Sequence, residues 1–397
     1  MRILLVNQYF PPDSSASAQL VGELAEDLAR HHRVVVLAGR PSYNPGAMAP
    51  DPPGTRVVRA WSTTFHRVSM LGRVANYASF LASSLVRAMF LPRPDVVVAL
   101  TDPPAIGLVG LLASRRYRVP FVYVCQDIFP DVAVALGMLR NPAVVGMWRR
   151  LNRRLQSGSA RVVVIGRDMR AKLEREGVPP ERITLIRNWG NGQALPAVER
   201  RRIRRHLGWE GRTVVMHAGN LGLAQNPGVL VKAAALLRDT DVQVVFLGDG
   251  AARPGVEALV GRLGCENVSF LPYRPTDEAQ QLMCAADLHV VSLHPGLLGC
   301  VAPTKVYGIL AAGRPFVAAV QPGSEPGLLV EEIGCGARVD PDDPAALAGA
   351  IRRLADGSLD EMGSRARRAF NERFNRTSST GQYRDLLESL ERGRSKG

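Results

Sequence analysis

The sequence predicts an α/β protein made of two Rossmann-like domains, each a doubly wound parallel sheet, that face a central cleft. Three observations support this prediction. The chain has 397 residues, which is too long for one ordinary hydrophobic core. Short β-branched runs alternate with helical patterns, and this alternation starts again after about residue 210. The apolar runs are continuous, as in strands that are buried on both faces of a parallel sheet.

Nine segments have the pattern of such strands, and the polar, Arg-rich stretch 188–212 is expected to join the two domains. The strand candidates are 2–8, 33–39, 95–100, 121–126 and 161–166, then 213–219, 242–250, 287–293 and 315–320. The last helices, at about 360–393, are polar and amphipathic, with no strand after them. Because ligands bind at the carboxyl ends of the strands in open α/β sheets, the loops that follow strands are the candidate site.

Composition and charge narrow the class of protein. With 46% hydrophobic and 22% charged residues, the chain is expected to be a soluble globular protein. The net charge of +14 is concentrated in residues 1–195, which hold 25 Lys and Arg against 13 Asp and Glu. Such a basic half indicates either an anionic partner, such as phosphates or an acidic membrane surface, or a solvated Arg-rich surface. Nucleic acid is the least favoured partner, since no basic patch interleaved with aromatic residues is present.

The cysteines and the apolar segments indicate the compartment. Five scattered cysteines without CxxC or Cys/His ligand spacing predict reduced thiols in the cytosol and no zinc site. The N-terminus has the pattern of a first strand rather than of a signal peptide. The longest apolar stretch, Val74–Leu91, contains Arg87 and several polar residues. It is therefore expected to be at most a surface-seeking amphipathic helix and not a membrane span.

The first candidate loop follows strand 2–8. Pro11 and Pro12 turn the chain, and the small residues Ser14–Ala18 open a helix. Small residues at a helix N-terminus let a phosphate or sugar approach the backbone N–H groups. The alternative is a Ser-rich turn with an N-cap.

Three more loops follow strands in the second half. Gly219 and Gly222 lie between a strand and a helix but lack GxGxxG spacing, so a phosphate cradle and an ordinary turn both remain open. Gly248–Gly250 would let a flat ligand approach closely, unless Asp249 simply caps the following turn. The rigid segment Pro272–Pro275 could hydrogen-bond a base edge, or be a plain connection.

The fifth loop leads into PTKVYGILAAGRP, residues 303–315. Thr304 is a good N-cap, and Lys305 then falls in the first turn of an apolar helix. A cation is disfavoured at a helix N-terminus unless an anion lies between it and the dipole. A bound phosphate would explain the lysine, and a solvated lysine that points outward is the alternative.

Several of these stretches together resemble the retaining glycosyltransferases of family 4, which have the two-domain GT-B fold. The stretches are YFPP with the small residues after it, AGNLG, GDG and PTKVYGILAAGRP. One subgroup of the family, found in O-antigen and colanic-acid-type assembly, has a segment similar to residues 126–139, QDIFPDVAVALGML. The resemblance covers nearly the whole chain. It implies an acceptor-binding domain at 1–190, a nucleotide-sugar donor-binding domain at 191–375, and a C-terminal helix, about 375–397, that packs back on the first domain.

The resemblance also implies roles for individual residues, by position. The catalytic residues would be Asp127 and Lys305. The donor phosphates and sugar would be bound by Ser15, Ala16, Ser17, Asn220, Gly222, Gln225, Val301, Ala302, Thr304 and Lys305. The base and ribose would be bound by Gly248, Asp249, Gly250, Tyr273 and Arg274. No metal and no cofactor are expected, because lysine and helix dipoles can neutralise the leaving diphosphate.

The chain departs from the family pattern at several positions. Cys300 and Gly308 stand where members have two glutamates, and Asn220 and Gln225 replace an Arg and a Lys. Gln126 replaces the His that often precedes the aspartate. Contacts to sugar and ribose hydroxyls would then come from Asp249, Glu325 or loop backbone.

The implied function is a metal-independent, retaining hexosyltransferase. It would move a sugar from a nucleotide-diphosphate donor, with a UDP-sugar favoured, to the hydroxyl of a lipid-linked sugar in cell-surface polysaccharide assembly. A natural-product glycosyltransferase with a small-molecule acceptor, a nucleotide-sugar 2-epimerase and a non-catalytic nucleotide-sugar binder are the alternatives. The expected location is cytoplasmic, with the anionic inner face of the cell membrane as a further partner.

Overall fold

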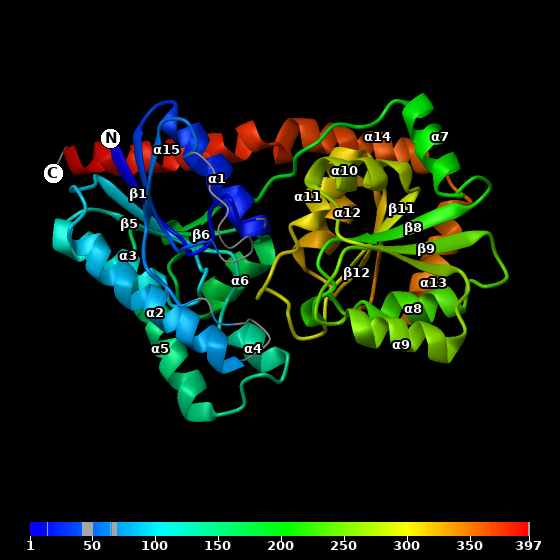
Figure 1. Cartoon of the computed structure of the whole chain (residues 1–397), viewed down its shortest axis with the longest axis horizontal. Helices are drawn as coiled ribbons and strands as arrows, with labels where there is room; N and C mark the ends of the chain where they lie inside the picture. Colours follow the sequence, from blue (N-terminus) through cyan, green and yellow to red (C-terminus); the bar gives the residue numbers. More distant parts are fainter. Residues whose placement is uncertain (14, 42–50, 64, 66–69, 396–397) are drawn as a thin grey trace.

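The computed structural model describes residues 1–13, 15–41, 51–63, 65 and 70–395, which form two α/β domains (Figure 1). In these residues the N-terminal domain has one parallel sheet of seven strands in the order β3-β2-β1-β4-β5-β6-β7. Its strands are β1 (Arg2–Val6), β2 (Arg33–Ala38), β3 (Thr55–Arg59), β4 (Val96–Ala99), β5 (Phe121–Cys125), β6 (Arg161–Val164) and β7 (Ile183–Leu185). Its helices are α1 (Ala16–Ala29), α2 (Met70–Met89), α3 (Gly107–Tyr117), α4 (Asp131–Ala135), α5 (Pro142–Gly158), α6 (Arg167–Arg175) and the 3₁₀ turn η1 (Pro180–Arg182).

The C-terminal domain repeats this architecture with six parallel strands among the described residues, in the order β10-β9-β8-β11-β12-β13. The strands are β8 (Thr213–Ala218), β9 (Val242–Leu247), β10 (Val268–Leu271), β11 (Leu288–Ser292), β12 (Phe316–Ala319) and β13 (Gly336–Val339). The helices are α7 (Ala197–His206), η2 (Leu223–Gln225), α8 (Gly228–Ala235), α9 (Arg253–Leu263), α10 (Thr276–Ala285), α11 (Lys305–Ala312), α12 (Glu325–Ile333), α13 (Pro344–Ala355), α14 (Leu359–Ala369), the π-helical turn η3 (Phe370–Phe374) and α15 (Arg376–Ser395).

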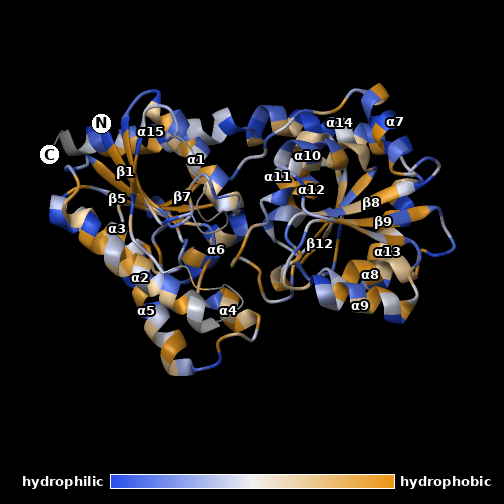
Figure 2. Ribbon diagram, viewed as in Figure 1, coloured by the Kyte–Doolittle hydropathy of each residue, from blue (hydrophilic) through white to orange (hydrophobic). Residues whose placement is uncertain are grey.

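The continuous apolar runs form strands because both faces of each sheet are covered. In β1, Leu4 and Val6 pack into one buried cluster, while Ile3 and Leu5 pack into the cluster on the opposite face. All four are buried. Figure 2 shows the strands of both sheets in hydrophobic colours, with hydrophilic colour gathered on helix exteriors and loops. The parallel, doubly wound prediction is therefore confirmed, and in each sheet the carboxyl ends of the strands lie at one edge.

The C-terminal helix α15 crosses back over the N-terminal domain (Figure 1). Its Tyr383 and Leu387 are 2% and 1% exposed and belong to the same buried cluster as β1 and α1. Arg376 at its start donates at 2.8 Å to Asp27 and at 2.9 Å to Glu26, both on α1. Apolar burial and a charged anchor thus hold α15 against α1.

The chain passes between the domains twice, and the two crossings touch. Gly190, in the first crossing, forms an isolated parallel bridge with Asn375, in the second. The Gly190 N–H donates to the Phe374 carbonyl at 3.2 Å. A Cβ at position 190 would lie 2.4 Å from the Tyr307 carbonyl oxygen, so only glycine fits at this junction.

All nine strand candidates form strands, each one to three residues shorter than expected. The strand candidates missed the four short strands at the sheet edges, β3, β7, β10 and β13. β3 and β13 are only partly buried, and β7 has three residues, so none of them carries a long apolar run. The joining stretch 188–212 contains helix α7, which contacts α10. Within the described residues, no helix has the length and apolarity needed to cross a bilayer.

Candidate active site

Two loops, one from each domain, are joined at the cleft. Asp127, which follows β5, forms an isolated antiparallel bridge with Val301, which precedes α11. The N–H of Ile128 donates to the carbonyl of Cys300 at 2.8 Å. The two loops that carry the candidate catalytic residues therefore contact each other directly, although they lie far apart in the sequence.

Lys305 is the first residue of α11, as predicted, and the helix ends at Gly313 in the left-handed region (φ 64°). Thr304 stands at the N-cap position, as predicted, but its backbone angles are helical and its side chain makes no capping hydrogen bond. The Lys305 Nζ lies 3.0 Å from His217 Nε2, at the end of β8. Its Cε lies 3.9 Å from where a Cβ on Gly219 would be. The lysine therefore extends under the Gly219–Gly222 loop.

Burial governs the charge of this pair. Removal from water lowers the pKa of Lys305 to about 7. The pKa of His217 is held well below its ordinary value, first by burial and then by the Lys305 ammonium. His217 is therefore neutral near pH 7, while Lys305 titrates in that range. Among the described residues, no carboxylate lies within ion-pair distance of Lys305.

The glycine loops after β8 and β9 pack on one another. Leu221 N–H donates to the Asp249 carbonyl at 2.8 Å, and Ala252 N–H donates to the Leu221 carbonyl at 2.8 Å. A Cβ on Gly248, whose φ is +127°, would lie 2.3 Å from the Gly219 carbonyl oxygen. The close approach therefore requires glycine, and it brings two backbone loops together beside Lys305.

The three polar candidates in the first of these loops lie together. A Cβ on Gly222 would lie 2.6 Å from Gln225 Oε1 and 2.9 Å from Asn220 Nδ2. Asn220 is exposed. The Gln225 Oε1 atom is buried and has no hydrogen-bond partner among the described residues.

The base and ribose candidates lie toward the edge strand β10. The Asp249 carboxylate accepts from the N–H of Gly250 at 2.7 Å, which is the local turn contact that the sequence left as an alternative. Tyr273 is 61% exposed, and Arg274, just before α10, lies 3.7 Å from Glu278 in that helix. In the part of the chain that the structure describes, no hydrogen bond or ion pair joins Tyr273 or Arg274 to Lys305.

The first loop of the N-terminal domain forms the N-terminus of α1. Ser15 is the N-cap and accepts from the Ala18 N–H at 3.2 Å, as the alternative interpretation of this loop expects. The Ser17 hydroxyl donates to the Asp102 carboxylate at 2.9 Å, and Ala16 is exposed. Ser14 lies outside the described residues. Ser17 thus connects this loop to Asp102, which follows β4.

Asp127 lies on the same side of the cleft. Burial, and then the nearby Asp102 carboxylate, raise the pKa of Asp127 to about 7. Asp127 as a residue is exposed, so contact with solvent reduces this rise in its pKa. The Thr101 hydroxyl oxygen accepts from the N–H groups of Gln126, at 3.0 Å, and Asp127, at 3.3 Å. Gln126 exchanges two side-chain hydrogen bonds with Asn188.

The two positions that lack the expected glutamates differ in environment. Cys300 is 3% exposed, and burial raises the pKa of its thiol to about 11, so the thiol stays protonated. Gly308 is half-buried in α11, and a Cβ there would meet only the flexible end of Met283, at 3.4 Å. Ala302 packs against the core of the N-terminal domain.

Glu325 is occupied by other partners. Its carboxylate accepts from the Arg167 N–H at 2.7 Å, from Arg167 Nε at 3.1 Å and from Arg187 Nε at 2.7 Å. Glu325 is 1% exposed. This α12 carboxylate therefore ties the two domains together, and the suggestion that it contacts ribose is not supported by its bonding.

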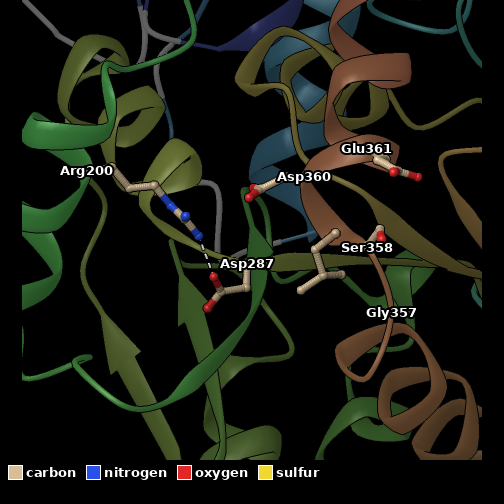
Figure 3. A pocket seen from close by; sticks show the side chains of 7 residues that line it. Arg200, Asp287, Gly357, Ser358, Asp360 and Glu361 are labelled. Atoms are coloured by element: carbon tan, nitrogen blue, oxygen red, sulfur yellow. Dashed lines mark hydrogen bonds and ion pairs between the residues drawn. The ribbon is translucent and has the colours of Figure 1, made fainter.

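A separate pocket of about 350 Å³ lies between α7, β11 and α14 (Figure 3). Arg200 and Asp287 point toward each other in it, and Arg204 and the Val214 N–H also donate to Asp287, both at 2.8 Å. Asp287 precedes β11, so this pocket lies at the amino ends of the strands, away from the cleft. Across the described residues, no group of three or more His, Cys, Asp or Glu side chains is placed to hold a metal ion.

The sequence reasoning missed two residues of the site, His217 and Asp102. His217 is the penultimate residue of β8, and Asp102 lies three residues beyond β4, so both stand near the carboxyl end of a buried strand. Neither belongs to a glycine-rich or proline-rich motif. Position at a strand end would have identified both.

Comparisons with known proteins cover both domains. Residues 16–189 match the family described as Glycosyl transferase 4-like domain, and residues 212–357 match the family Glycosyl transferases group 1. The chain is 27% identical over 301 residues to "Probable glycosyltransferase WbjE" of Pseudomonas aeruginosa, with 75% of each chain covered. It is 26% identical over 377 residues to "Putative colanic acid biosynthesis glycosyl transferase WcaI" of Escherichia coli, with 89% of this chain and 92% of the relative covered.

Solved structures share the fold. HepE from Anabaena, in complex with UDP and glucose, superposes with a TM-score of 0.74 at 20% identity, covering 98% of this chain and 100% of that one. Sucrose-phosphate synthase from Thermosynechococcus elongatus superposes with a TM-score of 0.80 at 17% identity, covering 98% and 99%. At such identities these structures establish the GT-B arrangement of the two domains.

Proposed function

The chain belongs to the family-4 glycosyltransferases of the GT-B fold, of the O-antigen and colanic-acid type, and from this premise we propose that it transfers a sugar from a nucleotide-diphosphate donor to an acceptor hydroxyl with retention of configuration. A UDP-sugar is the favoured donor, and the structure of HepE in complex with UDP and glucose supports this choice. The C-terminal domain would bind the donor and the N-terminal domain the acceptor.

The observation that carries the proposal is the position of Lys305. Its ammonium reaches the Gly219–Gly222 loop without a carboxylate partner among the described residues, at the N-terminus of an apolar helix. A diphosphate there would be stabilised by the ammonium, the helix dipole and backbone N–H groups. The same groups would stabilise the negative charge that grows on the leaving diphosphate in an oxocarbenium-like transition state.

The N-terminal domain would supply the groups that meet the sugar and the acceptor. Asp127, whose loop is bridged to Val301, is the proposed catalytic partner of Lys305. Retention would follow front-face attack, with the donor phosphate as proton acceptor, so a pair of hydrolase-type carboxylates is not needed. We propose that no metal takes part, because Lys305 and the helix N-terminus can supply the neutralising charge.

The proposed acceptor is a lipid-linked sugar at the inner face of the cell membrane. Helix α2 carries Val74 and Val86, 58% and 60% exposed, and Phe90 directly after it is 84% exposed. Together with the basic N-terminal half, this apolar surface suits an anionic bilayer. Binding to vesicles of anionic phospholipid, weakened by salt and by Phe90→Ser, would support the lipid acceptor; absence of vesicle binding at low salt would favour a soluble acceptor.

The function itself is tested with UDP-, GDP- and dTDP-sugars. Each is scored first for binding by thermal shift and then for transfer to a mixed acceptor panel. A ligand at 100 times its dissociation constant stabilises the folded protein by about 2.7 kcal/mol, which is readily detected. Transfer that requires an acceptor supports the proposal. Turnover of the donor without any acceptor would indicate an epimerase, and binding without turnover would indicate a nucleotide-sugar binder.

A further inference from the structure

His217 is the one hydrogen-bond partner of the Lys305 side chain among the described residues. The two groups lie 3.0 Å apart, between Lys305 Nζ and His217 Nε2. When Lys305 is protonated, its ammonium has three donors and no acceptor, so the imidazole nitrogen accepts. The proton of the neutral ring is then on Nδ1. The contact is therefore directional, from the lysine to the histidine.

The histidine is held rigidly. It is fully buried in β8, and its ring lies 5.7 Å from the ring of Phe246 on the adjacent strand β9. Phe246 in turn stacks on Phe270 at 5.3 Å. A ring enclosed by strands and aromatic neighbours has little rotational freedom. The position of Nε2 is consequently set by the sheet and not by a mobile loop.

A long lysine side chain needs such a fixed partner. Lys305 has four flexible side-chain torsions, and fixing them on ligand binding costs conformational entropy. Its Cε lies close under Gly219, so the ammonium held at His217 is already beside the loop. One N–H bonds to His217, which leaves two donors for phosphate oxygens.

We propose that His217 is a positioning residue that fixes the Lys305 ammonium beside the Gly219–Gly222 loop, ready for the diphosphate of the donor. This inference rests on the proposed function, because it assigns the lysine to a diphosphate. His217 acts through Lys305 and does not itself contact the donor phosphates. It remains uncharged while it does so, since its pKa lies well below the ordinary value.

A second buried histidine, His289, lies near Lys305 and His217 but has a different hydrogen-bond partner. His289, on the neighbouring strand β11, bonds through Nε2 to the Met283 carbonyl at 3.0 Å, and burial lowers its pKa to about 4. It is fully buried and equally part of the sheet, but it makes no hydrogen bond to Lys305. His289 therefore serves as a matched control for the loss of a buried histidine.

The test is a set of UDP titrations by calorimetry on folded variants. His217→Phe keeps a ring but removes the acceptor, and His217→Gln keeps an acceptor near the position of Nε2. A hydrogen bond to a charged group predicts that His217→Phe weakens UDP binding about 10-fold to 100-fold. The UDP affinity of His217→Gln is expected within about threefold of the wild type, because glutamine keeps a hydrogen-bond acceptor. The UDP affinity of His289→Phe is also expected within about threefold, because His289 does not bond to Lys305.

A double-mutant cycle separates positioning from structural damage. In a Lys305→Ala background, His217→Phe should cause no further loss of UDP affinity, because the residue through which it acts is gone. Equal losses in both backgrounds, or equal losses for His217→Phe and His217→Gln, would overturn the positioning role. So would a His217→Phe variant that binds UDP as the wild type does.

Nucleotide binding by the wild type separates a failure of this inference from a failure of the proposed function. A wild type that binds none of UDP, GDP and dTDP contradicts the donor assignment of Lys305, and the inference falls with it. A wild type that binds one of them, together with an unaffected His217→Phe variant, contradicts the inference alone. The titrations then use whichever nucleotide binds.

Discussion

Asp127 and Val301 belong to different domains, and their backbones form an antiparallel bridge at the mouth of the cleft. This bridge places the backbone of Asp127 against the loop that leads into Lys305. The geometry of the site therefore depends on the relative position of the domains, and any change that separates them also separates the two candidate catalytic residues.

Lys305→Ala should reduce turnover without unfolding the protein. If the ammonium stabilises charge on the leaving diphosphate, its loss should lower kcat/KM about 10²-fold to 10³-fold. Steady-state kinetics with the donor that binds best will measure this. Lys232→Ala, on the exposed side of α8, is the control and should leave kcat/KM unchanged. A Lys305→Ala enzyme with wild-type kcat/KM would remove Lys305 from the mechanism.

Donor binding should weaken as the pH rises through 7. Lys305 has a pKa of about 7 in the free protein, and a bound diphosphate would raise it, so binding favours the protonated lysine. Affinity is then highest below pH 7 and falls by at most about tenfold per pH unit above it, until the pKa of the bound state is reached. His217 stays neutral throughout this range.

Calorimetric titration of UDP between about pH 6 and 8.5 measures this dependence. Lys305→Met provides the baseline, since it retains the titration of the nucleotide and loses that of the lysine. Asp127, whose pKa is raised, also loses its proton as the pH rises, and the negative charge that results would weaken anion binding in the same sense, so Asp127→Asn should be examined in parallel. The prediction is wrong if the UDP affinities of the wild type and of Lys305→Met show the same pH dependence.

Glu325→Gln should destabilise the contact between the domains. The carboxylate is 2% exposed and pairs with Arg167 and Arg187, so removing its charge should cost about 1.5–3 kcal/mol. Thermal unfolding will show this as a lower Tm. Glu332→Gln removes a 37% exposed partner of Arg167 and should cost less than about 1 kcal/mol. Equal Tm values for Glu325→Gln and Glu332→Gln would contradict the larger contribution of the buried carboxylate to stability.

Restoring the two absent glutamates should have opposite effects on stability. Gly308→Glu meets only the movable end of Met283 and gains helix propensity, so its Tm should be unchanged or higher. Cys300→Glu buries a carboxylate at a position that is 3% exposed, which costs several kcal/mol. Circular dichroism melting of both, with Cys300→Ser as the size-matched control, tests this. A stable Cys300→Glu protein would show that the loop can open.

The sequence was sufficient to predict the fold because the central strands are apolar on both faces. Strands such as β1 and β8 need no tertiary information, whereas β3 and β13 are stabilised by their neighbours and carry little signal of their own. Family resemblance and helix electrostatics together indicated Lys305. The N-cap position of Thr304 was also predicted correctly, but not that its side chain would make no capping hydrogen bond.

The contacts of the site could not be read from the sequence in the same way. His217 and Lys305 are 88 residues apart, and Asp127 and Val301 meet only because two sheets face each other. Glu325 was considered as a ribose ligand because its sequence neighbours do not show that Arg167 and Arg187 reach it. Such pairings depend on domain placement, which local patterns do not encode.

The C-terminal helix has a consequence for the order of biosynthesis. Tyr383 and Leu387 complete a cluster whose other members begin at the first strand, so the N-terminal domain receives these core residues only after the C-terminal domain has been translated. When the ribosome has made the whole N-terminal domain, the hydrophobic core of that domain still lacks these two residues. The first of the two domains to be made is thus the one whose core needs the last helix of the chain.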